Sequence, residues 1–200
     1  MYITDYKKDI MIKYSITIIA VMLFNASFAQ HGHFGIKGGL NLATLCGESD
    51  VYSNKTGFHL GMLYHIHISQ HFAIQPELLY SMQGAKVKNS IFKNNLTLNY
   101  VNIPILAQYM FDNGFRLETG PQPGILVSAK QNYNGTDLNI KDDLNSFDLS
   151  WAFGVGFITH KKWGIDARYN LGITKLPEAG GGDYKNGVFQ LGLFYQFEGR

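Results

Sequence analysis

The chain has 200 residues and a formal net charge of +2 at pH 7, with 16% charged and 14% aromatic residues. A chain of this length suits one domain, and so small a charge from scattered basic residues gives no indication of nucleic-acid binding. No run of 18 apolar residues follows residue 30, which argues against a helical membrane protein.

The first 29 residues have the three parts of a secretory signal peptide in order. A positive start with Lys7, Lys8 and Lys13 is followed by an apolar core over residues 14–24 and by the small residues Ser27 and Ala29. We therefore predict a signal peptide over residues 1–29 and a mature domain over residues 30–200. Met11 is an alternative start to Met1, because a complete signal also follows it.

Eight stretches of the mature chain alternate large apolar residues with small or polar residues. Side chains of a strand alternate between its two faces, so each stretch is predicted to be a strand with one apolar face. A tilted strand of about 9–11 residues can cross a bilayer. The stretches cover residues 33–45, 56–69, 72–85, 96–110, 115–129, 147–159, 163–174 and 188–197.

The fourth and fifth stretches depart from simple alternation. In the fourth, Leu98 and Tyr100 fall on the face opposite to the later apolar residues, which predicts a bulge or a change of environment near Tyr100. Pro104 has no N–H and is predicted to break a ladder bond there. Pro121 and Pro123 predict a distortion in the middle of the fifth strand.

The connections between the strands are short and long in strict alternation. The short ones cover residues 70–71, 111–114 and 160–162, and the long polar ones cover residues 46–55, 86–95, 130–146 and 175–187. Transmembrane barrels show this asymmetry, with short periplasmic turns and longer extracellular loops. The predicted fold is therefore all-β, an eight-stranded antiparallel up-and-down transmembrane β-barrel.

The two faces of the strands predict which side meets lipid. The apolar face carries almost no charge, whereas the other face is rich in Gly, Ala, Ser and Asn and carries single charges. Eight strands leave just enough interior space for side chains and no open channel. Buried charges must pair, so we predict an interior ion network made by Glu77, Arg116, Glu118, Asp148, Asp166 and Arg168.

Histidines offer the main alternative chemistry. His59, His65 and His67 share the inward face of the second strand, and two of them could reach one metal ion. Hydrogen bonds to interior carboxylates such as Glu77 are the simpler interpretation, and no metal or other cofactor is predicted. The sequence His67-Ile68-Ser69 is similar to the His-x-Ser of barrel lipid deacylases, but it is predicted to face inward at the short-turn end.

Four segments resemble the PorT-like outer-membrane β-barrel domain family of small barrels in Gram-negative bacteria. They are residues 34–41 (FGIKGGLN), 75–81 (QPELLYS), 100–106 (YVNIPIL) and 166–172 (DARYNLG), and the resemblance covers residues 33–197. It implies the barrel fold and the outer membrane of the cell envelope as location. The resemblance does not indicate an enzymatic activity.

The last strand has the features of an insertion signal for outer-membrane barrels. Its large apolar face is made by Leu191, Leu193, Tyr195 and Phe197, although residues 198–200 follow where such a signal usually ends. The expected partners are outer-membrane lipid, the barrel assembly machinery and an envelope or extracellular partner of the long loops. The expected function is non-enzymatic, structural or in surface interaction. An accessory part in a secretion machinery and a lipid-modifying barrel enzyme are the alternatives.

Overall fold

The computed structural model describes residues 32–47, 52–87, 94–133, 136–176 and 183–197. Ten strands and one short 3-10 helix form in this part of the chain. They are β1 (Gly32–Cys46), β2 (Tyr52–His67), β3 (Phe72–Val87), β4 (Asn94–Asn102), β5 (Ile105–Met110), β6 (Phe115–Tyr133), β7 (Thr136–Asn139), η2 (Lys141–Asp143), β8 (Phe147–Ile158), β9 (Trp163–Gly172) and β10 (Lys185–Gln196). The predicted signal peptide lies outside the described residues.

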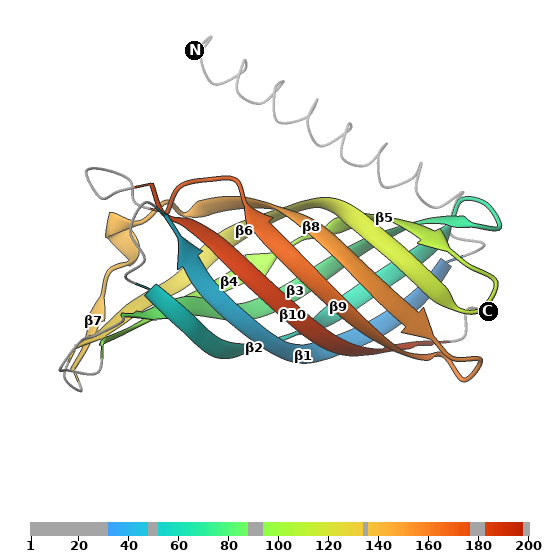
Figure 1. The fold of residues 1–200 in the computed structure, drawn as a ribbon, viewed down its shortest axis with the longest axis horizontal. Coiled ribbons are helices and arrows are strands. Elements are labelled where there is room, and N and C mark those ends of the chain that lie inside the picture. The colour runs from blue at the N-terminus through green and yellow to red at the C-terminus, as the bar shows by residue number, and fades with distance from the viewer. Residues whose placement is uncertain (1–31, 48–51, 88–93, 134–135, 177–182, 198–200) are drawn as a thin grey trace, which may run out of the picture. The chain divides into compact units, whose positions relative to one another are not determined.

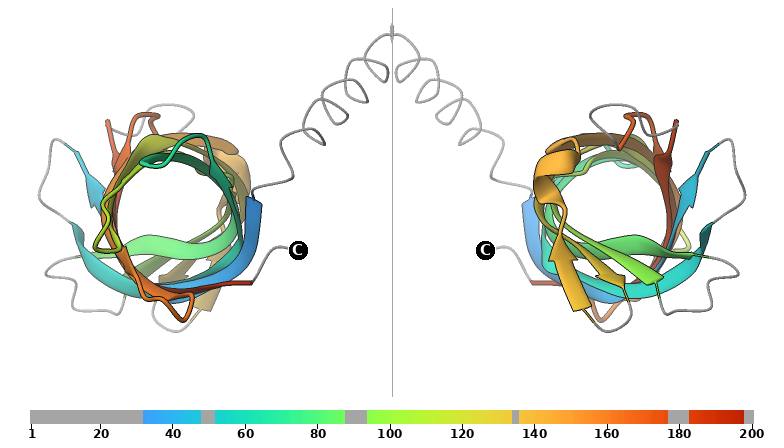
Figure 2. Two further views of the ribbon diagram at one scale, coloured as in Figure 1. Left: turned by 90° about the vertical axis from the view of Figure 1, so that its right-hand side faces the viewer. Right: turned by 90° about the vertical axis from the view of Figure 1, so that its left-hand side faces the viewer.

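The strands form one antiparallel sheet that closes on itself as a barrel (Figures 1 and 2). Closure is made by β1 and β10, which pair from Gly35–Gln196 to Cys46–Lys185. β4 and β5 both pair with β3 and with β6, so together they occupy one place in the ring. With β7 outside the ring, eight strand places remain, which confirms the predicted fold class.

The barrel has a short-turn end and a long-loop end. The short-turn end carries the tight connections after β2, β5 and β8, which are closed by backbone hydrogen bonds such as Ile68 N–H to Phe72 O at 2.8 Å and Thr159 N–H to Trp163 O at 2.8 Å. Lys162 takes a positive φ of 68° in the last of these turns. The strand ends that lead into the longer connections lie at the opposite end, as the alternation of lengths predicts.

The outer wall is apolar and the interior is polar, as the alternation predicts. Large hydrophobic side chains of every ring position are exposed outward, with Leu193 on β10 61% exposed and Phe153 on β8 52% exposed. Between them, polar residues point inward and are buried, such as Gln190 at 0% and Arg168 at 1%. This arrangement is the reverse of a soluble protein and fits a wall that faces hydrocarbon.

The irregular region joins β4 and β5 to β6. The predicted bulge is confirmed, since the register of β4 against β6 shifts between Asn99 and Tyr100. The predicted single fourth strand is interrupted between β4 and β5, at Ile103 and Pro104. Here the ring is held by isolated bonds, including Ile103 N–H to Pro123 O at 2.8 Å.

The distortion predicted in the middle of the fifth strand is absent from the pairing of β6 with β8. β6 pairs with β8 without a register shift from Phe115 to Ile125, through both Pro121 and Pro123. The carbonyl of Pro123 points to the β4–β5 side, so the missing N–H groups of the two prolines face the seam that is already interrupted. The prolines therefore cost no ladder bond with β8.

The long loop after β6 has structure of its own. β6 extends to Tyr133, paired with β4 along one edge, and its last four residues pair with β7 along the other edge, from Lys130–Asn139 to Tyr133–Thr136. This β6–β7 hairpin projects at the long-loop end (Figure 1), where the sequence predicted only a polar loop. Among the described residues, no helix has the length and apolar character needed to cross a membrane.

The outward position of Phe153 gives a direct test of the lipid-facing wall. Phe153→Arg is expected to destabilise the barrel by about 2–4 kcal/mol, because an arginine at mid-depth must lie in hydrocarbon. Urea unfolding of the barrel in phospholipid vesicles measures this free energy. Phe153→Leu is the matched control and should lose much less, since the side chain stays apolar. Equal stability of the two variants would contradict the assignment of this face to lipid.

Candidate functional site in the barrel interior

An ion network crosses the short-turn half of the interior, and Arg168 on β9 is its centre. The Arg168 Nη1 and Nη2 atoms donate to the two carboxylate oxygens of Glu77 on β3, at 2.9 and 3.0 Å. Its Nε donates to Oε1 of Glu118 on β6 at 2.9 Å. All three side chains are at most 2% exposed. The planar guanidinium thus binds Glu77 through two parallel hydrogen bonds and Glu118 through a third, a geometry that the single ammonium group of a lysine cannot provide.

Lys37 on β1 joins a second pair to this network. Its Nζ lies 2.7 Å from Oδ2 of Asp166 and 3.8 Å from Oε1 of Glu77. Gln75 also donates to Glu77, at 2.8 Å. Lys37 lies on the inward face of the first predicted strand, but it was not among the predicted network residues. Its inward position and single charge were the available signal, since an unpaired cation is unstable in a closed interior.

Two predicted members of the network lie apart from it. Asp148 is near the long-loop end of β8, where the hydroxyl of Thr174 donates to it at 2.6 Å. Asp166 is near the short-turn end of β9, so the antiparallel register separates the two aspartates along the barrel. Arg116 makes no ion pair with a described residue. It donates to Gln108 at 3.4 Å and lies 4.8 Å from the ring centroid of Phe194.

A layer of neutral hydrogen bonds lies next to the ion network. Asn41 Nδ2 donates to the hydroxyl of Ser81 at 3.0 Å, and Asn41 Oδ1 accepts from Gln190 at 3.0 Å. His59 Nδ1 lies 2.8 Å from the same Asn41 oxygen. These side chains come from β1, β2, β3 and β10, so the layer ties the walls near the closure of the ring together.

The long-loop half of the interior is closed by an apolar cluster. Tyr100 is completely buried in it, and Asn186 on β10 donates to the Tyr100 hydroxyl at 3.4 Å. The apolar residues on the inward face of the fourth predicted strand belong to this cluster, so they fill the long-loop half of the interior and do not face lipid. The cluster consists of Leu45, Ala85, Leu98, Tyr100, Leu126, Ala129 and Leu176.

The histidines of β2 form hydrogen bonds and ring contacts. His65 Nδ1 lies 3.2 Å from Gln75 Oε1, and the rings of His65 and His67 meet edge to face at 4.6 Å. Within the described ranges, no group of three or more His, Cys, Asp or Glu could hold a metal ion. Neither His59 nor His65 contacts a carboxylate directly, so the expected partner Glu77 is replaced by amide side chains. Ser69 accepts from the Phe72 N–H at 3.2 Å in the short turn.

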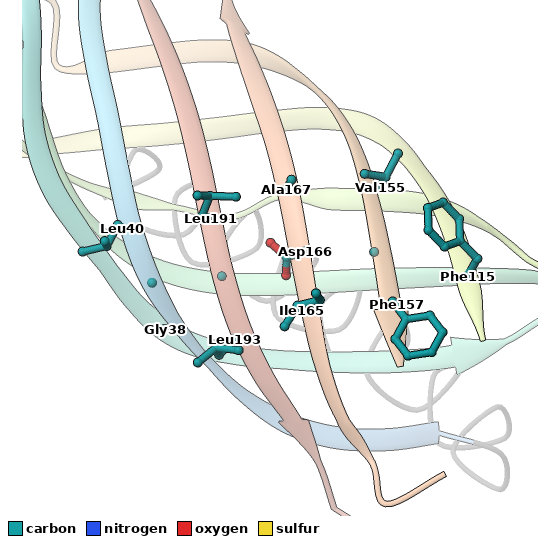
Figure 3. A pocket seen from close by; sticks show the side chains of 13 residues that line it. Gly38, Leu40, Phe115, Val155, Phe157, Ile165, Asp166, Ala167, Leu191 and Leu193 are labelled. Atoms are coloured by element: carbon teal, nitrogen blue, oxygen red, sulfur yellow. The ribbon is translucent and has the colours of Figure 1, made fainter. Parts of the chain in front are cut away.

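The outer wall has a hollow of about 470 Å³ over β1, β10, β9, β8 and β6 (Figure 3). Its floor is formed where Gly38 and Ala167 leave the wall thin, and large side chains such as Leu40, Leu193 and Phe157 surround it. Because these side chains face outward and are apolar, the hollow suits hydrocarbon chains. Asp166 is the one charged residue of its lining, and it is paired with Lys37 in the interior.

The predicted insertion residues lie on the outer face of β10 and just beyond it. Leu191 and Leu193 are 50% and 61% exposed. The Phe197 ring stacks on Phe34 with centroids 6.0 Å apart and meets Tyr195 edge to face at 5.3 Å. The Phe197 N–H also donates to the Phe34 carbonyl at 2.7 Å. Phe197 thus contacts the first strand at the point where the ring closes, at the level of an aromatic girdle.

The closed ring, the apolar wall and the paired interior charges define an integral membrane β-barrel. The chain belongs to the family described as outer membrane protein β-barrel domain, whose model matches residues 28–178. No curated protein sequence matches the chain.

Solved structures of outer-membrane barrels are similar to the chain in fold. Neisserial surface protein A has a TM-score of 0.58 at 14% identity, covering 82% of this chain and 97% of that one. Ail, the attachment invasion locus protein of Yersinia pestis, has a TM-score of 0.53 at 21% identity, covering 84% and 100%. Ail in complex with the heparin analogue sucrose octasulfate has a TM-score of 0.52 at 20% identity over the same shares. At these identities the likeness concerns the fold alone.

Removing the centre of the ion network should destabilise the barrel strongly. Arg168→Leu leaves Glu77 and Glu118 buried without their shared cation, which is expected to cost about 3–5 kcal/mol. The variant should therefore unfold at a lower temperature in detergent than the parent protein. Adding Glu77→Gln and Glu118→Gln to Arg168→Leu should recover part of the loss, because both uncompensated charges are then removed. An unchanged unfolding temperature for Arg168→Leu would show that the network does not stabilise the fold.

The contacts of Phe197 predict a defect in assembly. Phe197→Asp places a carboxylate against Phe34 at the membrane interface, so less protein should reach the outer membrane in its folded, heat-modifiable form. Deleting residues 198–200 is the matched control and should leave the folded fraction unchanged. Normal assembly of Phe197→Asp would mean that the strand is recognised without this aromatic residue.

Proposed function

We propose that this outer-membrane barrel has a non-enzymatic role in surface interaction, performed by its long-loop end. The observation that carries this proposal is that side chains cross the interior at two levels. The ion network around Arg168 crosses the short-turn half, and the apolar cluster around Tyr100 crosses the long-loop half. A barrel built in this way suits neither conduction nor catalysis inside the lumen.

The β6–β7 hairpin is the best candidate for the interacting surface. All four residues of β7 are exposed, including Leu138 at 52%. The hairpin is held by its ladder with β6 and by a hydrogen bond from Asn132 Nδ2 to Asp137 Oδ1 at 2.6 Å. A preformed edge strand can present side chains to a partner at a lower entropic cost than an unstructured loop.

The base of this loop is tied to the rim of the barrel. The Asn145 N–H donates to the Leu176 carbonyl at 2.8 Å, and Asn145 Nδ2 donates to the Lys175 carbonyl at 2.8 Å. Ile140 N–H donates to the Ala129 carbonyl at 3.2 Å. These bonds hold the hairpin in one orientation relative to the wall, which supports a role in recognition.

We also propose that the chain is exported by cleavage of residues 1–29 and belongs to the PorT-like group of small barrels. Its partners are then outer-membrane lipid, the barrel assembly machinery and a molecule outside the cell. The motifs at residues 75–81 and 166–172 support this grouping, because they supply Glu77, Asp166 and Arg168 to the interior network. A part in an envelope or secretion machinery is the alternative that shares this location.

Replacing the hairpin tests the proposed role. In the test variant, a Gly-Ser turn replaces residues 131–138, and the protein is compared with the parent in nanodiscs on an array of matrix proteins and polysaccharides. We expect the parent to bind at least one component and the variant to lose that binding while keeping its heat-modifiable mobility. Neither protein should conduct ions in a planar bilayer. Steady conductance by the parent, or modification of outer-membrane lipids by the purified protein, would contradict the proposal.

A further inference from the structure

A polar cavity of about 570 Å³ lies at the short-turn end of the barrel, on the side opposite to the β6–β7 hairpin. Figure 2 (left) shows this end of the ring from outside. The lining comes from the starts of β1 and β6, the ends of β2 and β10, and the turns after β2, β5 and β8. We call it the periplasmic cavity. Its polar lining residues belong neither to the lipid-facing wall nor to the ion network around Arg168.

Arg116 is a buried cation that lines this cavity with most of its donors unused. The residue is 3% exposed, and its one hydrogen bond to a described residue is the 3.4 Å contact with Gln108 Oε1. The Gln108 amide donates instead to Glu118, at 2.9 Å, so Gln108 separates the guanidinium from the nearest network carboxylate. A guanidinium has five N–H donors in a planar fork. Arg168, in contrast, uses its fork on two carboxylates.

Gln196 on β10 is a second buried donor in the lining. It is 3% exposed, and its Nε2 atom has no hydrogen-bond partner among the described residues. A buried amide N–H without an acceptor costs about 1–3 kcal/mol, so an acceptor in the cavity would stabilise it. The cavity therefore has two buried hydrogen-bond donors, Arg116 and Gln196, and both would be stabilised by an acceptor.

The remaining lining has few acidic groups. Lys162 and His160 in the turn after β8 add further nitrogen atoms at the mouth. Asp112 is the single carboxylate among the lining residues, and it lies 88% exposed at the rim, 3.5 Å from Nε2 of His71. Arg116 and Lys162 thus give the lining more cationic than anionic side chains, which favours an anion in the cavity.

We propose that the periplasmic cavity binds a small molecule that carries an oxyanion, either a carboxylate or a phosphate. The Arg116 fork binds two oxygens of the group side by side, and the Gln196 amide donates to one of them. A cavity of about this size accepts a small organic ligand rather than a folded domain. The ligand enters from the periplasm, so its binding does not depend on what the β6–β7 hairpin contacts.

Nuclear magnetic resonance of arginine side chains tests this proposal in the intact protein. The chain has three arginines, Arg116, Arg168 and Arg200, so their Nε–H signals can be assigned by single substitutions. Protein in zwitterionic nanodiscs is titrated with inorganic phosphate, with succinate and with chloride at matched ionic strength. We expect a saturable shift of the Arg116 signal with phosphate or succinate and no shift of the Arg168 signal. The anion that saturates the Arg116 shift at the lower concentration is the one that the cavity prefers.

Variants separate a specific site from general attraction. Gln196→Leu should weaken the binding by about tenfold or more, because a donor to a charged group is lost. Arg116→Gln should abolish it, read from the side-chain amide signal of Gln196. Lys161→Gln is the matched control, since Lys161 is exposed in the same turn but does not line the cavity. Heat-modifiable mobility shows that each variant is folded.

Three outcomes would overturn the proposal. One is the absence of a saturable shift with both phosphate and succinate. Another is an equal shift with chloride, which would indicate charge screening without a site. The third is unchanged binding in folded Gln196→Leu and Arg116→Gln. Binding at the long-loop hairpin is measured separately, so failure here leaves that result unaffected.

Discussion

The closed hydrogen-bond ring is the constraint on which the rest of this structure depends. Hydrocarbon offers no partner to a peptide N–H or C=O, so each strand that crosses it must be paired on both edges. Pairing of β1 with β10 meets this demand over twelve residue pairs, from Gly35 to Cys46. Once the sheet is closed, one face of every strand must meet lipid and the other must fill a narrow lumen. The alternation of apolar with small or polar residues in the sequence follows from these two environments.

The lumen solves a second problem, the placement of charges away from water. Three cations and three anions share its short-turn half, but they are not equally satisfied. Lys37, Arg168 and the carboxylates of Glu77, Glu118 and Asp166 are in direct contact, whereas Arg116 is held by an amide and an aromatic ring. Charges that serve only stability are expected to be fully paired, whereas most donors of the Arg116 guanidinium have no partner among the described residues. The unequal pairing therefore marks the end of the interior where a ligand can take part.

Sequence reasoning was most successful where a local rule determines the structure. The period of two gave the strands and their faces, and the positions of Tyr100 and Pro104 gave the bulge and the break in the fourth strand. Contacts across the ring could not be read in this way, because they depend on register and strand tilt. Asp148 and Asp166 look alike in the sequence, yet the pairing of Gly156 with Asp166 places Asp148 near the other end of the barrel. The β6–β7 hairpin was missed because β7 is short and polar and has no apolar alternation.

Two of the interior contacts join strands on opposite sides of the ring. Arg168 on β9 meets Glu77 on β3, and at another height Asn186 on β10 meets Tyr100 on β4. Each pair is separated by half the circumference, so these contacts act as internal cross-ties at right angles to the hydrogen-bonded wall. A circular sheet held only by its ladder could flatten under lateral pressure from the bilayer while every backbone bond stayed intact. The cross-ties oppose that deformation, which gives the barrel a fixed cross-section as well as a closed edge.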